Sequence, residues 1–342
     1  MNSQLVYFLF FVVISVSPTV WGQTPSSESA PKSSGNSSNN PQSLTKIPPG
    51  VILIKGAWSS ATDSVTPVPE DATVVKGIFS DPYFGMRYTL PPDWIQEYEG
   101  PPPSESGRYV LAQIGPPDTD KKNAAASMVI TAQDMFFTPF PASNAQELAH
   151  YLRDHLQADY RVEQSPTPAE IAGRAFTFFA YWSPVAQLHW YVWTTEIRCH
   201  AVQFILTTRD TKQLQTLLLG MNKMTLLDDA SPTGGAGGGS VPVCIKDYAR
   251  DQNIIARVEP VFSEHRFNPV PVRIIIDKDG KVKHIHFISA FPEQASALTY
   301  ALMQWKFKPY RVNGQPVEVE SGILFGRAPR TAAPPAARSA IK

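Results

Sequence analysis

Alternating apolar and polar positions are clearest between residues 272 and 288. Val272, Ile274 and Ile276 lead into the turn Asp277-Lys278-Asp279-Gly280, and a second alternating run covers residues 282–288. Asp-Gly between two such runs predicts a β-hairpin, because a glycine accepts the positive φ that a tight connection needs. We therefore expect two antiparallel strands here.

A helix and a third strand are predicted to follow this hairpin. Pro292 suits a first helical turn, where the missing N–H costs nothing. The apolar positions of the helix recur at i, i+3, i+4 and i+7, and they are Leu298, Ala301, Leu302 and Trp305. The turn Asn313-Gly314-Gln315-Pro316 then precedes a strand over residues 317–325. The expected order is strand, strand, helix, strand.

This part of the chain resembles the C-terminal domain of TonB, the periplasmic end of the energy-transducing protein of Gram-negative bacteria. The resemblance covers about residues 241–326. It rests on the D-x-D-G hairpin, on Trp305-Lys306-Phe307-Lys308-Pro309 and on Gly314-Gln315-Pro316-Val317. It implies a small β-β-α-β domain that pairs a strand with an envelope or outer-membrane protein, such as a TonB-dependent receptor.

The third strand is the candidate sheet edge for that pairing, since an exposed edge can accept an extended peptide as a further strand. The candidate partner-binding residues alternate along it and are Val317, Val319, Ser321, Ile323 and Phe325. No catalytic, cofactor-binding or metal-binding residue is assigned. The sequence contains no G-x-S-x-G, Walker or dinucleotide-binding pattern, so it gives no positive case for an enzyme.

A second compact region is predicted over residues 74–228. Strands are expected at residues 109–114, 127–132, 175–182, 189–196 and 199–207. Helices are expected at residues 144–156, with Ser143 as N-cap, and at 212–221. The region resembles the PsbP-like α/β sandwich through its opening Tyr83-Phe84-Gly85, Leu90-Pro91 and Trp94 and through its strand-rich second half. The chain as a whole is predicted to be α+β, with an antiparallel sheet in this region.

Composition divides the rest of the chain. A signal peptide is predicted at 1–22, a Ser/Pro/Asn-rich, largely disordered tether at 23–73, a Gly-rich linker at 229–240 and a disordered Ala/Pro tail at 328–342. The folded domains at 74–228 and 241–327 are expected to be independently stable.

The N-terminal apolar run favours secretion to the periplasm. It is shorter than the ~20 residues that cross a bilayer and contains Pro18. The alternatives are an uncleaved inner-membrane anchor at residues 5–20, as in a TonB-type energy transducer, and an envelope enzyme with an unrecognised site. The chain carries 30 basic and 30 acidic residues, so no broad basic field favours nucleic acid.

Three features have both a structural and a functional interpretation. Cys199 and Cys244 flank a predicted domain boundary; two free thiols are favoured over a disulfide. His284 and His286 share one strand face, which is expected to be solvated, with metal binding near His265 as the alternative. The aromatic run His189-Trp190-Tyr191 and Trp193 is expected to be a core strand, with a carbohydrate or peptide platform as the alternative.

Overall fold

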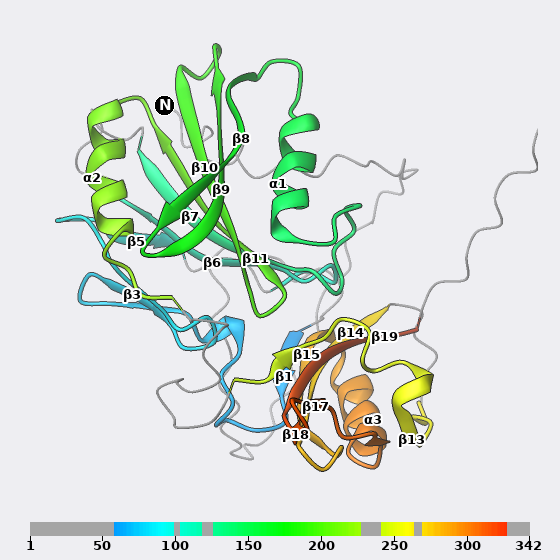
Figure 1. Ribbon diagram of the computed structural model, residues 1–342. Helices are drawn as coiled ribbons and strands as arrows, with labels where there is room; N and C mark the ends of the chain where they lie inside the picture. Colours follow the sequence, from blue (N-terminus) through cyan, green and yellow to red (C-terminus); the bar gives the residue numbers. More distant parts are fainter. Residues whose placement is uncertain (1–57, 99–102, 118–125, 227–240, 263–268, 327–342) are drawn as a thin grey trace, which may run out of the picture.

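The computed structural model describes residues 58–98, 103–117, 126–226, 241–262 and 269–326 (Figure 1). These residues form a strand-rich α+β structure, as predicted. We call residues 69–226 the N-terminal region and residues 241–326 the C-terminal region. Within the described ranges, no helix is long and apolar enough to cross a membrane.

The N-terminal region is built on a seven-stranded sheet in the order β5-β6-β7-β11-β10-β9-β8. Every neighbouring pair in it is antiparallel. The strands are β5 (Ile95–Tyr98), β6 (Arg108–Gly115), β7 (Ser127–Asp134), β8 (Arg161–Ile171), β9 (Arg174–Ser183), β10 (Leu188–Ile197) and β11 (His200–Thr208). The antiparallel sheet expected here is therefore present, and β8 is a strand that the sequence pattern did not predict.

Helices α1 (Ala145–Asp154) and α2 (Thr211–Met221) lie on opposite faces of this sheet (Figure 1). Ala149 of α1 packs on Phe179 and Val192, whereas Leu217 of α2 joins the larger core on the other face. The N-cap of α1 is Asn144, one residue beyond the predicted Ser143. Its side chain accepts a hydrogen bond from the Glu147 N–H at 2.8 Å, which satisfies a free amide of the first turn.

A small antiparallel sheet completes the N-terminal region. It consists of β2 (Thr73–Val75), β3 (Ile78–Asp81) and β4 (Met86–Thr89), preceded by the 3₁₀ turn η3 (Pro69–Asp71). Buried residues of these segments, including Phe79, Met86 and Tyr88, join the same core as α2. This sheet and α2 together close one face of the seven-stranded sheet.

The C-terminal region contributes most of a five-stranded sheet in the order β1-β15-β14-β19-β12. The strands are β1 (Trp58–Ala61), β12 (Val243–Cys244), β14 (Val270–Ile276), β15 (Val282–Ala290) and β19 (Val319–Phe325). Helix α3 (Pro292–Leu302) packs its buried Leu298 and Leu302 on one face. The predicted order of strand, strand, helix and strand is present as β14, β15, α3 and β19.

The β14–β15 hairpin turns where the sequence predicts it. Gly280 has φ 82°, and Asp277 Oδ1 accepts hydrogen bonds from the amides of Asp279 and Lys281. A Cβ at position 280 would lie 2.0 Å from the Phe307 carbonyl oxygen, so the position requires glycine. The turn is thereby fixed by its own dihedral angles and by the backbone of Phe307, which lies against it.

Shorter elements surround α3. They are η4 (Asp251–Asn253), β13 (Ile254–Ala256), β16 (Lys306–Phe307), β17 (Arg311–Val312) and β18 (Gln315–Pro316). Trp305 is buried, but it follows α3 and does not end it, because the helix stops at Leu302. Its indole N–H donates to the Val258 carbonyl at 2.8 Å. The apolar spacing therefore predicts the end of this helix about one turn too late, because it counts Trp305 among the helical positions.

The structured part of the chain begins within the predicted tether. Strand β1 pairs with β15, and residues 62–73 continue from it into the N-terminal region. The predicted tether is therefore wrong for residues 58–73, because β1 completes one edge of the C-terminal sheet. The predicted signal peptide, glycine linker and C-terminal tail, and also His265, lie outside the described residues.

Candidate functional site at the contact between the two regions

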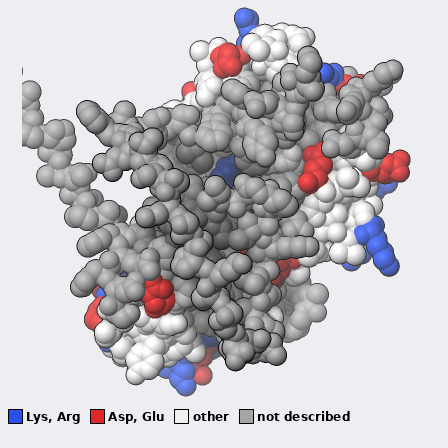
Figure 2. All heavy atoms as spheres, turned by 180° about the vertical axis from the view of Figure 1, so that it is seen from behind, with Lys and Arg blue, Asp and Glu red and all other residues white. Residues whose placement is uncertain are grey.

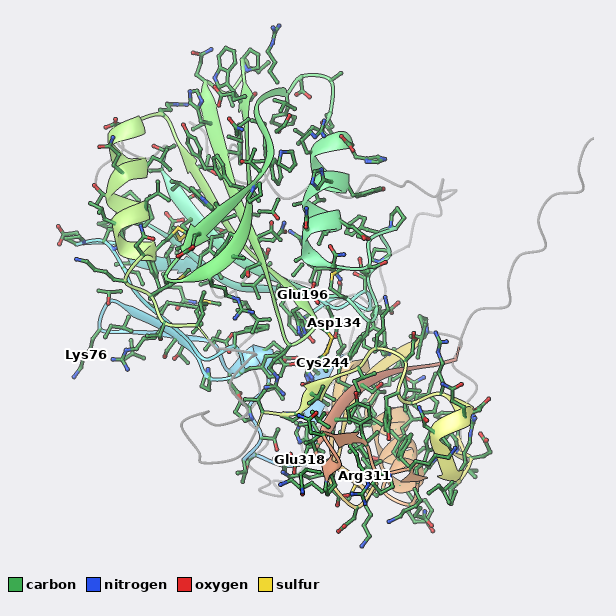
Figure 3. All side chains as sticks on the ribbon, in the orientation of Figure 1. Lys76, Asp134, Glu196, Cys244, Arg311 and Glu318 are labelled. Atoms are coloured by element: carbon green, nitrogen blue, oxygen red, sulfur yellow. A yellow bond between two sulfur atoms is a disulfide. The ribbon has the colours of Figure 1, made fainter. Side chains whose placement is uncertain are left out.

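The C-terminal sheet buries both of its faces. Side chains that alternate with the α3-facing set point toward the N-terminal region, and they include Arg273, His284, His286 and Glu320. Ile288 of this face joins the core of the N-terminal region. The polar face of the predicted hairpin is therefore an internal contact, which Figure 3 locates by the labels of Asp134 and Cys244.

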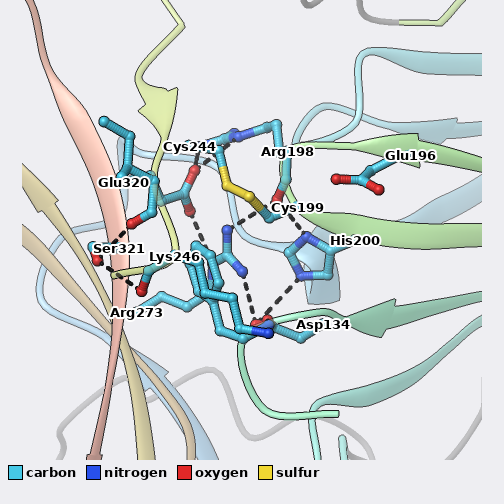
Figure 4. Close-up of a disulfide and its surroundings, with 12 residues drawn as sticks. Asp134, Glu196, Arg198, Cys199, His200, Cys244, Lys246, Arg273, Glu320 and Ser321 are labelled. Carbon is cyan, nitrogen blue, oxygen red and sulfur yellow. Dashed lines mark hydrogen bonds and ion pairs between the residues drawn. A yellow bond between two sulfur atoms is a disulfide. The ribbon is translucent and has the colours of Figure 1, made fainter. Parts of the chain in front are cut away.

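Four charged side chains meet in this contact. Arg273 Nη1 lies 2.8 Å from Asp134 Oδ2, and Arg273 Nε lies 3.1 Å from Glu320 Oε1 (Figure 4). Arg198 Nη2 lies 2.6 Å from Glu320 Oε2. Two guanidinium groups thus face two carboxylates, and no side chain of the four is more than 7% exposed. The chain of ion pairs joins β7 and the β10–β11 turn to β14 and β19.

Aromatic rings and backbone carbonyls complete the surroundings of the two arginines. The Tyr83 hydroxyl donates to Glu320 Oε1 at 2.9 Å, and the Arg198 guanidinium lies 3.8 Å from the Tyr83 ring centroid. Arg273 lies 4.3 Å from the ring centroid of Phe136 and donates to the Arg198 carbonyl at 3.0 Å. Hydrogen bonds and cation–π contacts of this kind offset the cost of removing guanidinium groups from water.

Electrostatics favour the charged forms of Glu320 and of both arginines. Burial alone would raise the pKa of Glu320, but Arg198 and Arg273 outweigh it and hold that pKa well below its usual range. Burial likewise opposes the charge of Arg273, but Asp134, Tyr83 and Glu320 together outweigh it, so the pKa of Arg273 is raised. Glu320 and the two arginines are therefore charged in the interior, whereas burial raises the pKa of Asp134 and the contact with Arg273 offsets this only in part.

His200 lies beside the cluster and is neutral. Burial, followed by the nearby Arg273 charge, lowers the pKa of its imidazole well below the usual value. Nδ1 lies 2.9 Å from the Arg198 carbonyl, which can only accept, so Nδ1 carries the proton. Nε2 is 3.6 Å from Asp134 Oδ2, beyond a hydrogen bond. The neutral imidazole therefore donates a hydrogen bond to the Arg198 carbonyl and stabilises the β10–β11 turn.

That turn has an unusual backbone. Arg198 and Cys199 are its two central residues, with φ of 49° and 54°. Consecutive positive φ angles suit the tight hairpin turn that normally takes Asn-Gly, and side chains with a Cβ adopt them at a cost of order 1 kcal/mol or more each. The turn nevertheless directs Arg198 to Glu320 and Cys199 to β12, so the strained residues are those that contact the C-terminal region.

Cys199 and Cys244 form a disulfide across the contact (Figure 4). Their Cα atoms are 6.1 Å apart, within the range that a disulfide spans. The sequence-based preference for two free thiols is therefore wrong. It was based on a domain boundary along the chain, whereas β12 runs beside β19 and brings Cys244 to the β10–β11 turn.

The two strand histidines are also buried, each with a carboxylate partner. His284 Nδ1 lies 2.7 Å from Asp63 Oδ2, and His286 Nε2 lies 2.9 Å from Glu70 Oε1. Burial lowers the pKa of His284, which the hydrogen bond to Asp63 offsets only in part. The expected solvated face is therefore wrong, because the segment that follows β1 covers it. Among the described residues no group of three or more His, Cys, Asp or Glu side chains is placed to hold a metal ion.

The predicted partner-binding residues have a different setting from the one expected. Val319 and Ser321 are buried, and Ile323 and Phe325 pack toward the α3 core. Val317 precedes β19 and donates its N–H to the Tyr310 carbonyl. β19 is also an inner strand at its start, since β12 pairs with Val319 and Glu320. The odd-numbered side chains thus belong to the core, because alternation turns them toward α3.

The outer side of β19 opens beyond the end of β12. The Glu320 carbonyl accepts from Ile245 on that side, so the backbone groups of Gly322 and Leu324 point the same way by the two-residue period. Within the described part of the chain, neither residue has a backbone partner there. Leu324 is 44% exposed. A short length of open sheet edge therefore remains next to the buried cluster.

The predicted aromatic strand divides between two faces. His189 and Tyr191 are half-buried on the face opposite α1, with Trp193 beside them, whereas Trp190 points to the other side.

Sequence reasoning missed the charged cluster altogether. One signal was available: Arg273 interrupts an otherwise apolar strand, and a buried arginine requires carboxylate partners.

The chain matches no family model and no curated protein sequence. A structure comparison finds the solution structure of cyanobacterial PsbP (CyanoP) from Synechocystis sp. PCC 6803 at 13% sequence identity and a TM-score of 0.31. The match covers 45% of this chain and 95% of that chain. The likeness to a PsbP-like protein is thus weak, and the resemblance of residues 241–326 to the TonB domain stays a prediction.

Proposed function

We propose that this protein is a non-catalytic component of the cell envelope whose TonB-like residues 241–327 bind a partner protein by strand addition. The observation that carries the proposal is the open side of β19 at Gly322 and Leu324. The Cys199–Cys244 disulfide supports it independently, since disulfides persist in oxidising compartments such as the periplasm.

The open edge can accept a strand with few rearrangements. Gly322 and Leu324 each offer an N–H and a C=O in the plane of the sheet, and each hydrogen bond formed there contributes roughly 0.5–1.5 kcal/mol net. The exposed Leu324 side chain supplies apolar contact at the same place. An extended segment with a small or apolar residue opposite Leu324 is therefore the favoured partner.

The opposite side of β19 holds the edge in place. β14 pairs with β19 along its whole length, and Glu320 is fixed by Arg198 and Arg273. A pre-formed edge binds more tightly than a mobile one, because less chain entropy is lost on association. The buried cluster would thus position the binding strand.

The experiment uses full-length protein and a synthetic peptide from the plug segment of a TonB-dependent receptor of the same cell. Leu324→Pro removes an outward N–H without removing a bond to β14, whereas Leu324→Ala keeps that N–H. Leu324→Pro is expected to weaken peptide binding roughly fivefold more than Leu324→Ala, as for one hydrogen bond. Bound peptide should also slow amide exchange at residues 322–324.

Equal effects of the two substitutions would exclude backbone pairing and point to the side chain alone. Binding that leaves exchange at residues 322–324 unchanged would place the peptide elsewhere on the protein. Absence of binding to any receptor segment would overturn the choice of partner class.

A further inference from the structure

One end of the seven-stranded sheet, with the β9–β10 turn, is remote from the C-terminal region (Figure 1). A groove lies at this end. Its volume is about 430 Å³, and it is lined by Glu163, Trp182, Gln187, His189 and Arg209. These residues come from β8, β9, the β9–β10 turn, β10 and the end of β11. Five segments thus form one small concave surface, which lies far from the disulfide-linked contact between the two regions.

The floor of the groove is aromatic. The Trp182 and His189 rings are 6.1 Å apart at their centroids and inclined by 23°, and His189 continues to Tyr191 at 6.2 Å and 14°. Strand alternation puts these rings on the face opposite α1. Their side chains are half-buried, and His189 remains 28% exposed. Aromatic rings in such a setting present apolar surface to a ligand with flat C–H faces.

The rim of the groove carries hydrogen-bonding groups with spare capacity. Among the described residues, Arg209 donates only to the Ala186 carbonyl, at 3.3 Å, and no carboxylate of these residues lies within ion-pair distance of it. Gln187 uses its amide N–H on the Pro184 carbonyl at 2.7 Å, which leaves its side-chain oxygen able to accept. Glu163 accepts from His189 through one oxygen at 2.8 Å, which leaves the other oxygen for a ligand.

These groups together select one ligand chemistry. An unpaired guanidinium binds a carboxylate through two parallel hydrogen bonds. Free carboxylate and amide oxygens accept from hydroxyl groups, and the aromatic floor contacts a ring with few polar atoms on its face. The Glu163 charge disfavours a phosphate, whose greater negative charge would lie in the same small groove.

We propose that this groove binds an oligosaccharide that carries carboxylate groups, with the Arg209 guanidinium on a carboxylate and the sugar ring over Trp182. The carboxyl and the hydroxyl groups of a uronic acid match the donors and acceptors on the rim. The site is independent of the β19 edge and of the strand addition proposed above.

The test is calorimetric titration of full-length protein with trigalacturonic acid and with its methyl ester, which removes the charge and keeps the rings. We expect the acid to bind at least tenfold more tightly than the ester, as for one charge-assisted hydrogen bond. Arg209→Gln should cause a similar loss, and so should Trp182→Ala. Trp182→Phe, which keeps an aromatic floor and its packing, should retain most of the affinity.

Arg311→Gln is the matched control, because Arg311 is likewise exposed and donates to a single backbone carbonyl, that of Gly314. It should leave the affinity unchanged. Equal binding of acid and ester, or no heat of binding up to about 10 mM acid, would overturn the proposal. Equally tight binding of triglutamate would show that the groove recognises carboxylates without a sugar, and equal losses from Arg311→Gln would remove the assignment to Arg209.

Discussion

Glu320→Gln tests the buried cluster most directly. The substitution keeps the shape of the side chain and removes the charge that faces Arg198 and Arg273. Asp134 then remains as the only carboxylate of the cluster against two guanidinium groups. Breaking a buried ion pair from one side costs about 3–5 kcal/mol, because an uncompensated charge stays in the interior. We expect a loss of that size in the free energy of unfolding.

The measurement is urea unfolding of the oxidised protein at pH 7, followed by fluorescence. Glu318→Gln is the control two residues away on the same chain segment. Glu318 pairs with Lys283 at 2.8 Å, and the lysine is 50% exposed (Figure 3). A pair that solvent screens in this way contributes about 0–1 kcal/mol. The two glutamates should therefore differ by a factor of three or more in their effect.

A double variant makes the reasoning sharper. Arg198→Met combined with Glu320→Gln leaves the single pair of Arg273 and Asp134, so the double loss should be smaller than the sum of the single losses. The expected coupling is about 1–3 kcal/mol. A cost below about 1 kcal/mol for Glu320→Gln, or strictly additive losses, would show that the four groups do not form a buried cluster.

Three further outcomes are expected. Burial lowers the pKa of His200 and His284 below 6.5 in the folded state; the unfolded chain therefore binds their protons first, and both histidines reduce the unfolding free energy as the pH drops from about 7 to 5. Burial raises the pKa of Asp81 to about 8 and also that of Asp134, which act in the opposite direction, so the histidines are followed individually by NMR titration. An imidazole that titrates at or above pH 6.5 would contradict its burial. Replacing both Cys199 and Cys244 with serine should cost about 4 kcal/mol, from a loop of 45 residues, in the same assay; an unchanged urea midpoint would argue against the disulfide. Trp305→Ala should cost about 3–5 kcal/mol, and a thermal melt within about 2 °C of the parent protein would place that ring at the surface.

Local sequence signals predicted the C-terminal hairpin, helix and third strand well. Asp277 and Gly280 encode the turn within four residues, and the spacing of Leu298 and Leu302 encodes the packed helix face. These signals act between residues close in the chain, so no knowledge of the tertiary arrangement was needed. The strand β8 was missed because Pro166 and Pro168 oppose a strand assignment, and an outermost strand tolerates them.

The candidate site was not predictable in the same way. Alternation along β15 correctly separated two faces, but it cannot tell whether a polar face meets water or a second layer of protein. Here Asp63 and Glu70 come from a segment more than 200 residues away and cover His284 and His286. The disulfide depends equally on a contact between two turns that no local pattern encodes.

The basic and acidic side chains also show why composition could not locate the site. On the face drawn in Figure 2, described Lys, Arg, Asp and Glu side chains lie in small separate groups of both signs. Equal numbers of the two signs in the sequence argued only against a broad basic field. Part of that balance is internal, since two arginines and two carboxylates neutralise each other between the regions.

The close joining of the two regions changes the meaning of the proposed binding edge. Composition predicted independently stable domains, yet separating them would expose Arg273 without Asp134 and Arg198 without Glu320. Glu320, Gly322 and Leu324 lie on one strand at successive intervals of two residues, and the last two carry the open backbone groups. Gly322 itself lies under Phe136 of the N-terminal region, where a Cβ would come within 2.7 Å of that ring. Under the proposed function, a partner that adds a strand to β19 therefore pairs with a strand whose other edge is held by β14 and whose face is covered by the N-terminal region.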